Sequence, residues 1–214
     1  MYDIQLFGRL EVRTRGVRLT GGDFGGVRPR HILALLALRG AMHRTELADL
    51  LCDGQPPAAP AATVEDDISL LRRRLDPAST VRTSVITSSN GRYELVADQV
   101  RVDVARFDEL VAAAGRRTGE RALPPLTAAA YLAAAPLLTG EDTAWAAEAR
   151  SVYRTRLREA LLNAAGHARS AGRQRDALAL AARAMEIDPV AERAWLLSMT
   201  ARQHAASRAV PLPA

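Results

Sequence analysis

The sequence predicts an α+β N-terminal half followed by an all-α C-terminal half. Strand-like alternation of apolar and polar residues occurs within residues 1–19 and 84–96. Helical periodicity of apolar residues fills the segment between them and nearly everything beyond residue 103. Aromatic residues make up only 4% of the chain, so Leu, Val, Ile and Ala must form the core, and Ala and Leu favour helices.

Short strands are expected first. Residues 2–6, 10–12 and 17–19 alternate in polarity and are separated by glycine turns, which predicts a small antiparallel meander. The glycine-rich segment 21–26 follows. It lacks the Lys-Ser/Thr of a phosphate-binding loop, so we interpret it as a plain connector.

Three helices are expected next. The first has Pro29 in its first turn and ends at Gly40, and the second covers residues 44–51. The third covers about residues 61–75. Its apolar residues fall at i, i+4, i+7 and i+11 and form one stripe, namely Val64, Ile68, Leu71 and Leu75. The residues roughly opposite this stripe are Asp66, Ser69, Leu70 and Arg73.

A β-hairpin closes the first half. Residues 84–87 and 93–96 are strand-like, and Asn90-Gly91 between them is the strongest short hairpin signal. The order of strands, three helices and hairpin predicts a winged helix–turn–helix over residues 1–98.

The second half is expected to be helical throughout. Helices are predicted near residues 104–114, 126–134, 142–171, 174–186 and 190–206. Leu161, Ala177, Ala184 and Pro189 match the spacing of one tetratricopeptide unit, and Trp195 lies 34 residues after Leu161. An ordinary helical bundle with Ala-rich seams is the alternative. We predict an all-α TPR-like domain over residues 99–206 and a frayed tail over residues 207–214.

All 29 basic residues are Arg. Codon bias in a GC-rich genome is the favoured explanation, and phosphate recognition, for which the guanidinium fork is suited, is the alternative. Residues 1–98 contain 13 Arg against 12 acidic residues, so this half is nearly neutral. Any nucleic-acid contact must therefore come from local clusters of Arg.

Enzymatic and metal sites are not indicated. The single cysteine, Cys52, excludes an intrachain disulfide and a zinc cluster, and the four His are scattered. The acidic trio Glu65-Asp66-Asp67 is explained by the dipole of the helix that it begins. We expect no enzymatic activity, no cofactor and no metal. The longest apolar run, residues 32–38, is too short to span a bilayer, and no signal peptide is evident, so a cytoplasmic protein is expected.

Candidate DNA contacts follow from the third helix and the hairpin. A recognition helix needs an apolar face that anchors it and a polar face that enters the major groove, and residues 61–75 have both. The alternative is a solvated helix end, where cations are favoured anyway. The side chains that we expect to contact bases or phosphates are Ser69, Arg72, Arg73, Arg74, Ser88, Ser89, Asn90 and Arg92.

The sequence resembles the SARP-type regulators of actinobacterial antibiotic pathways. The resemblance extends from about Tyr2 to Thr200 and depends on the order and spacing of several motifs. These are GGVRPR at 25–30, RTELADLL at 44–51, TVE at 63–65, LRRRL at 71–75, Gly91 with Tyr93, Val102-Asp103 with Arg106-Phe107, and Asp188-Pro189 with Glu192-Arg193.

The resemblance implies an OmpR-type winged helix joined to a bacterial transcriptional activation domain. It implies an activator of a secondary-metabolite cluster that binds direct repeats in promoter DNA as a homodimer, is associated with the nucleoid and recruits RNA polymerase. It also implies that Asp53, Gly54 and Gln55, in the loop between the second and third helices, contact the polymerase.

Three departures from the family pattern bear on this expectation. Cys52 stands where the family usually has Trp, and Ser69 and Leu70 stand where Arg is usual at one or both positions. Asp66 and Asp67 add acid where phosphate would approach, although an acid can accept from a cytosine amino group. The alternative function is therefore a protein-interaction adaptor with a TPR-like groove, whose winged helix has lost specific DNA readout.

Overall fold

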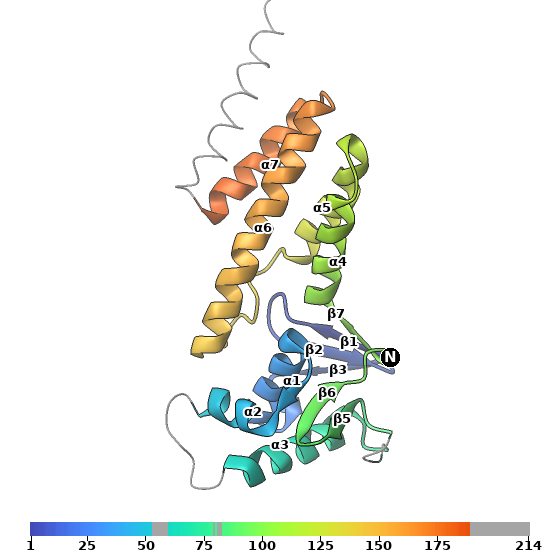
Figure 1. Cartoon of the computed structure of the whole chain (residues 1–214), viewed down its shortest axis with the longest axis vertical. Helices are drawn as coiled ribbons and strands as arrows, with labels where there is room; N and C mark the ends of the chain where they lie inside the picture. Colours follow the sequence, from blue (N-terminus) through green and yellow to red (C-terminus); the bar gives the residue numbers. More distant parts are fainter. Residues whose placement is uncertain (53–59, 79, 81–82, 189–214) are drawn as a thin grey trace, which may run out of the picture. The chain divides into compact units, whose positions relative to one another are not determined.

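The computed structural model of the chain describes residues 1–52, 60–78, 80 and 83–188 (Figure 1). It divides into two compact units. The first, called here the N-terminal unit, comprises Met1–Ala105 and Leu137–Glu148. The second, called here the helical unit, comprises Arg106–Pro136 and Ala149–Ala214.

The N-terminal unit begins with a four-stranded sheet. Strands β1 (Tyr2–Gln5), β2 (Glu11–Thr14) and β3 (Val17–Thr20) pair in antiparallel fashion, which confirms the predicted meander. A later strand, β7 (Val100–Val102), pairs with β1 in parallel, so the strand order is β3-β2-β1-β7. This pairing places residues 100–102 in the N-terminal unit, beyond the expected boundary at residue 98.

Asp103, the residue after β7, binds the chain directly beyond the end of β1. Its carboxylate accepts hydrogen bonds from the backbone N–H groups of Leu6 and Phe7 at 2.8–2.9 Å. A later segment also returns to this region, because the N–H groups of Leu138 and Thr139 donate to the carbonyls of Leu6 and Gly8. These hydrogen bonds satisfy backbone groups beyond the end of β1, which is why residues 103–105 and 137–148 belong to the N-terminal unit.

The three predicted helices are present in the predicted order. The 3₁₀ turn η1 (Gly21–Phe24) leads into α1 (Val27–Arg39), and α2 (Arg44–Leu51) and α3 (Pro60–Leu75) follow. Helix α3 packs against α1, α2 and η1. The predicted apolar stripe of α3 is confirmed, since Val64, Ile68, Leu71 and Leu75 are each at most 5% exposed.

The predicted hairpin is also confirmed. Strands β5 (Ile86–Ser89) and β6 (Arg92–Leu95) are joined by Asn90 and Gly91, whose φ angles of 49° and 73° give the left-handed backbone of a type I′ turn. The short strand β4 (Met42–His43), which the sequence did not predict, pairs with β6 and completes a sheet of order β4-β6-β5. We call β5–β6 the wing hairpin.

The helical unit contains most of α4 (Asp103–Gly115), the 3₁₀ turn η2 (Gly119–Ala122), α5 (Leu123–Leu132), most of α6 (Ala144–Ser170) and α7 (Gln174–Ile187). Alanines form much of its core, and their small side chains let helices approach closely. The buried members of the larger cluster are Ala114, Ala122, Leu123, Leu126, Ala160, Ala164, Ala168 and Ala177.

The repeat residues Leu161, Ala177 and Ala184 are all buried, whereas Pro189 and Trp195 lie outside the described residues. A tetratricopeptide-like repeat therefore stays a prediction. In the described ranges, no helix is long and apolar enough to cross a membrane, and no His, Cys, Asp and Glu side chains gather as a metal site would require.

Candidate nucleic-acid interface

The outward face of α3 carries a polar ridge. Asp66, Ser69 and Arg73 fall at i, i+3 and i+7 and are exposed, opposite the buried stripe, and Arg74 is exposed on the flank. The hydroxyl of Ser69 donates to the carbonyl of Glu65 at 2.8 Å while its side chain stays accessible. The ridge thus combines one acid, one hydroxyl and two guanidinium groups.

Arg72 differs from its two neighbours. Its Nε and Nη2 donate to the backbone carbonyl of Ile86 on β5 at 3.1 and 3.0 Å. The side chain is half-buried, and loss of hydration lowers the pKa of its guanidinium from the ordinary value. Arg72 therefore links α3 to the wing hairpin, and the two elements lie side by side (Figure 1).

Two of the three acids at the start of α3 are paired with Arg from the other helices. Asp67 lies 2.9 Å from Nε of Arg28 on α1, and Glu65 lies 3.1 Å from Nη1 of Arg44 on α2. For Asp66, the described part of the chain provides no such cation. The acid that would face DNA uncompensated is thus Asp66, and the Asp67 carboxylate is largely neutralised by Arg28.

Leu70 has a packing role. It is half-buried, and its side chain lies over Gly25, where an added Cβ would come within 2.7 Å of its Cδ2. Gly25 has a φ of +92°, and it lies directly after η1. The departure from the family pattern at position 70 therefore gives an apolar contact between α3 and the η1–α1 corner.

The wing hairpin presents its polar residues outward. Ser88, Ser89 and Asn90 are exposed, so their side chains are accessible to a bound phosphate. Arg92 is also exposed, but its Nη2 donates to the carbonyl of Ala41 at 2.7 Å. Arg92 is thus held against the residue that precedes β4, with its other guanidinium donors accessible.

The start of α2 adds residues that the sequence analysis did not include. The N–H of Arg44 donates to the carbonyl of Gly91 at 2.9 Å, so this helix begins beside the turn of the wing hairpin. Arg44 and Thr45 are exposed there. His43 caps the helix, because its Nδ1 accepts from the N–H of Thr45 at 3.4 Å. A polar RTE triplet at a helix start is the signal that could have identified these residues.

Tyr93 lies beneath this surface. Burial raises the pKa of its phenol, and the nearby carboxylate of Glu65 raises it further, while Arg72 and Arg44 act in the opposite direction. These neighbours come from α2 and α3, and Tyr93 itself belongs to β6, so three elements converge on one polar surface. Asp53, Gly54 and Gln55, the expected polymerase contacts, lie outside the described residues.

Comparisons with known proteins give a fold and no close relative. No protein-family model matches the sequence, and no curated protein matches it. Among solved structures, EmbR of Mycobacterium tuberculosis, determined in complex with a low-affinity phosphopeptide, superposes with a TM-score of 0.80 at 22% sequence identity. The match covers 96% of this chain and 55% of the EmbR chain, so this chain spans about half the length of EmbR. The likeness establishes that the two share a fold.

Proposed function

We propose that this chain is a DNA-binding transcriptional regulator whose N-terminal unit is a winged helix. The observation that carries the proposal is the geometry of α3: a fully buried stripe opposite an exposed ridge of Ser69, Arg73 and Arg74. Such a helix is anchored on one side and able to enter a major groove on the other. The SARP-type resemblance of the sequence and the EmbR-like fold over 96% of the chain both support it.

The contacts divide into two classes. Arg73 and Arg74 on the helix, and Ser88, Ser89, Asn90 and Arg92 on the wing hairpin, supply donors for phosphate oxygens. Ser69 and Asp66, on the outermost face of α3, are placed to read base edges, where a carboxylate accepts from the amino group of cytosine. Arg72 orients the surface by joining α3 to the wing hairpin, and Arg44 and Thr45 extend it.

The regulatory details are part of the same proposal and depend on the resemblance. We propose an activator of a secondary-metabolite cluster that binds direct repeats as a homodimer and recruits RNA polymerase through the loop with Asp53, Gly54 and Gln55. Half-sites about 10–11 base pairs apart would place both recognition helices on one face of the DNA. The proposed domains remain residues 1–98 for the winged helix and residues 99–206 for the activation domain.

The test is fluorescence anisotropy with the full chain on labelled DNA from upstream of its own gene and the neighbouring genes. Scrambled duplexes of the same composition serve as competitors, and the titration is repeated across a salt series. Tight binding that prefers the native sequence, with log affinity falling steeply with log salt, is expected. Weak and equal binding to both duplexes would contradict specific readout and favour the adaptor function.

A further inference from the structure

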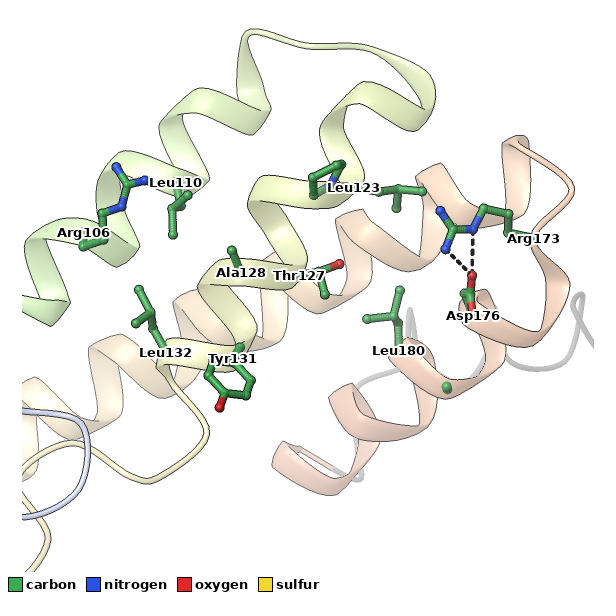
Figure 2. Close-up of a pocket in the computed structure, with 12 residues that line it drawn as sticks. Arg106, Leu110, Leu123, Thr127, Ala128, Tyr131, Leu132, Arg173, Asp176 and Leu180 are labelled. Atoms are coloured by element: carbon green, nitrogen blue, oxygen red, sulfur yellow. Dashed lines mark hydrogen bonds and ion pairs between the residues drawn. The ribbon is translucent and has the colours of Figure 1, made fainter.

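The helical unit contains a second candidate site, distant in sequence from the proposed DNA interface. Side chains of α4, α5 and the start of α7 line a groove of about 900 Å³ (Figure 2). Leu110, Leu132 and Leu180 form its apolar walls, one from each of these helices, and Tyr131 projects from α5. All of these residues belong to the helical unit, so the groove is a feature of that unit alone.

The outward face of α5 is unusual for a face in contact with water. Pro124, Thr127, Ala128 and Tyr131 fall at i, i+3, i+4 and i+7, all are exposed, and all line the groove. Tyr131 is 81% exposed. Although 25% of the chain is charged, residues 122–140 contain no charged side chain. Because exposed helix faces normally carry charges, this stripe has the composition of a face that another molecule covers.

Charged groups lie at the ends of the groove. Arg106 on α4 and Arg173 before α7 lie on opposite sides of it in Figure 2. Arg106 pairs with Glu109 at 2.9 Å and Arg173 with Asp176 at 2.6 Å, and all four side chains are about half-exposed or more. Exposed pairs of this kind contribute little stability, so either guanidinium can exchange its partner for an incoming carboxylate.

The charged residues of the lining give it a small net positive charge. It contains two Arg and one Asp, and the partner of Arg106, Glu109, is outside it. The charged groups lie at the two ends of the groove, whereas in a typical small-molecule site the polar groups converge on one point. Ala128 and Ala179 are small enough to admit the close approach of a helix between them.

From these observations we propose that this groove binds an acidic amphipathic segment of a partner protein. The apolar side chains of the segment enter the trough between Leu110, Leu132 and Leu180 and cover Tyr131. Carboxylates near its two ends bind Arg106 and Arg173. The site is formed by the helical unit alone, so this proposal does not depend on DNA binding by the N-terminal unit.

The test is a selection with the full chain as bait and a display library of helical peptides as the probe. The library has apolar residues fixed on one helix face and randomised residues at both ends. Enriched peptides are synthesised with a fluorescent label, and their affinity is measured by anisotropy. We expect acidic residues to be enriched at the ends, and a charge-reversed peptide with Lys in place of each acid to bind roughly tenfold more weakly or worse.

Variants of the full chain locate the binding. Tyr131→Glu should weaken peptide binding by about tenfold or more, as expected for an aromatic anchor. Because Tyr131 is so exposed, this variant should keep its fold, which circular dichroism checks. Val152→Glu is the matched control: Val152 is an exposed apolar residue of α6 outside the groove, and its replacement should leave affinity unchanged. Arg106→Glu and Arg173→Glu should each weaken the acidic peptides and improve the charge-reversed ones.

Three outcomes would overturn the proposal. The first is that no peptide is enriched. If sedimentation then shows a dimer of this chain that Tyr131→Glu disrupts, the groove binds a second copy of the chain instead of a partner segment. The second is that enriched peptides bind wild type and Tyr131→Glu equally. The third is that the enriched ends are basic. DNA binding by Tyr131→Glu, measured in parallel, should equal that of the wild type, so failure of the groove and failure of the proposed DNA site are distinguishable.

Discussion

The carboxylate of Glu141 lies 2.7 Å from Nε2 of His31, and this contact joins two residues that are 110 positions apart. Both side chains are 9% exposed. Arg30 completes the cluster with Nε 2.7 Å and Nη2 2.9 Å from the same carboxylate. Trp145 packs edge-on against the imidazole, with ring centroids 5.4 Å apart. The cluster holds the returning segment Leu137–Glu148 against α1 within the N-terminal unit.

Removal of this carboxylate should destabilise the N-terminal unit. Glu141→Ala leaves the guanidinium of Arg30 and the imidazole of His31 poorly solvated, and loss of one partner from a buried pair costs about 3 kcal/mol. Urea unfolding followed by tryptophan fluorescence measures the free energy of unfolding. Glu148→Ala is the control: its side chain is 73% exposed and 3.6 Å from Arg39, so it should change stability by less than about 0.5 kcal/mol. Equal effects of the two variants would contradict a structural role for the cluster.

Stability should depend on the ionisation of Glu11. Its carboxylate is nearly buried, and Nη2 of Arg18 and Nε of Arg13 each lie 2.5 Å from one of its oxygens. Hydrogen bonding from Arg18 is the largest cause of the lowered pKa of Glu11. A carboxyl whose folded pKa is lowered contributes stability above its ordinary pKa of 4.5, and this contribution is lost as pH falls through the folded value.

Glu11→Gln should therefore be less stable than wild type at pH 6, and the difference should shrink as pH falls below 4.5. Urea unfolding at a series of pH values measures it. Asp3→Asn, an exposed position on the neighbouring strand β1, is the control and should show no such convergence. A difference that stays constant with pH would mean that the charge of Glu11 contributes nothing.

Arg72 should contribute to folding more than Arg74 does. Arg72→Ala removes both hydrogen bonds to the carbonyl of Ile86, a buried residue, and loss of the donors to a buried acceptor costs about 1–3 kcal/mol. Arg74→Ala, at an exposed position two residues away, should stay within about 0.5 kcal/mol of wild type. Thermal and urea unfolding compare the two variants. Similar stabilities would show that the link between α3 and β5 contributes little.

Arg73 should act on DNA affinity alone. Arg73→Ala removes one exposed guanidinium, so it should weaken binding to every sequence and reduce the slope of log affinity against log salt by about one unit. The anisotropy titration across salt measures this slope. Arg116→Ala, an exposed Arg of the helical unit, should leave both affinity and slope unchanged. An unaltered slope in Arg73→Ala would contradict the proposed orientation of α3.

The sequence alone predicted the elements whose signals are local. The stripe from Val64 to Leu75 follows from helical periodicity, and the wing hairpin follows from Asn90-Gly91, because both patterns are contained in a few consecutive residues. It also predicted that Asp66, Ser69 and Arg73 lie opposite the buried stripe, where they are exposed, whereas Leu70, predicted on the same face, is half-buried. Helix α5 began three residues earlier than expected, because Pro124 and Pro125 are accommodated in its first turn.

Tertiary structure decided the roles of the polar residues on and around α3. Three adjacent Arg look alike in the sequence, yet Arg72 bonds to Ile86 while Arg73 and Arg74 stay exposed. Asp67 is neutralised by Arg28, 39 positions away, and Leu70 covers Gly25. The pairing of β7 with β1 and the contact of Glu141 with His31 likewise join distant segments. The physical reason is that periodicity fixes which face of an element is apolar, whereas the partner of each polar side chain depends on which distant segments the packed core brings beside it.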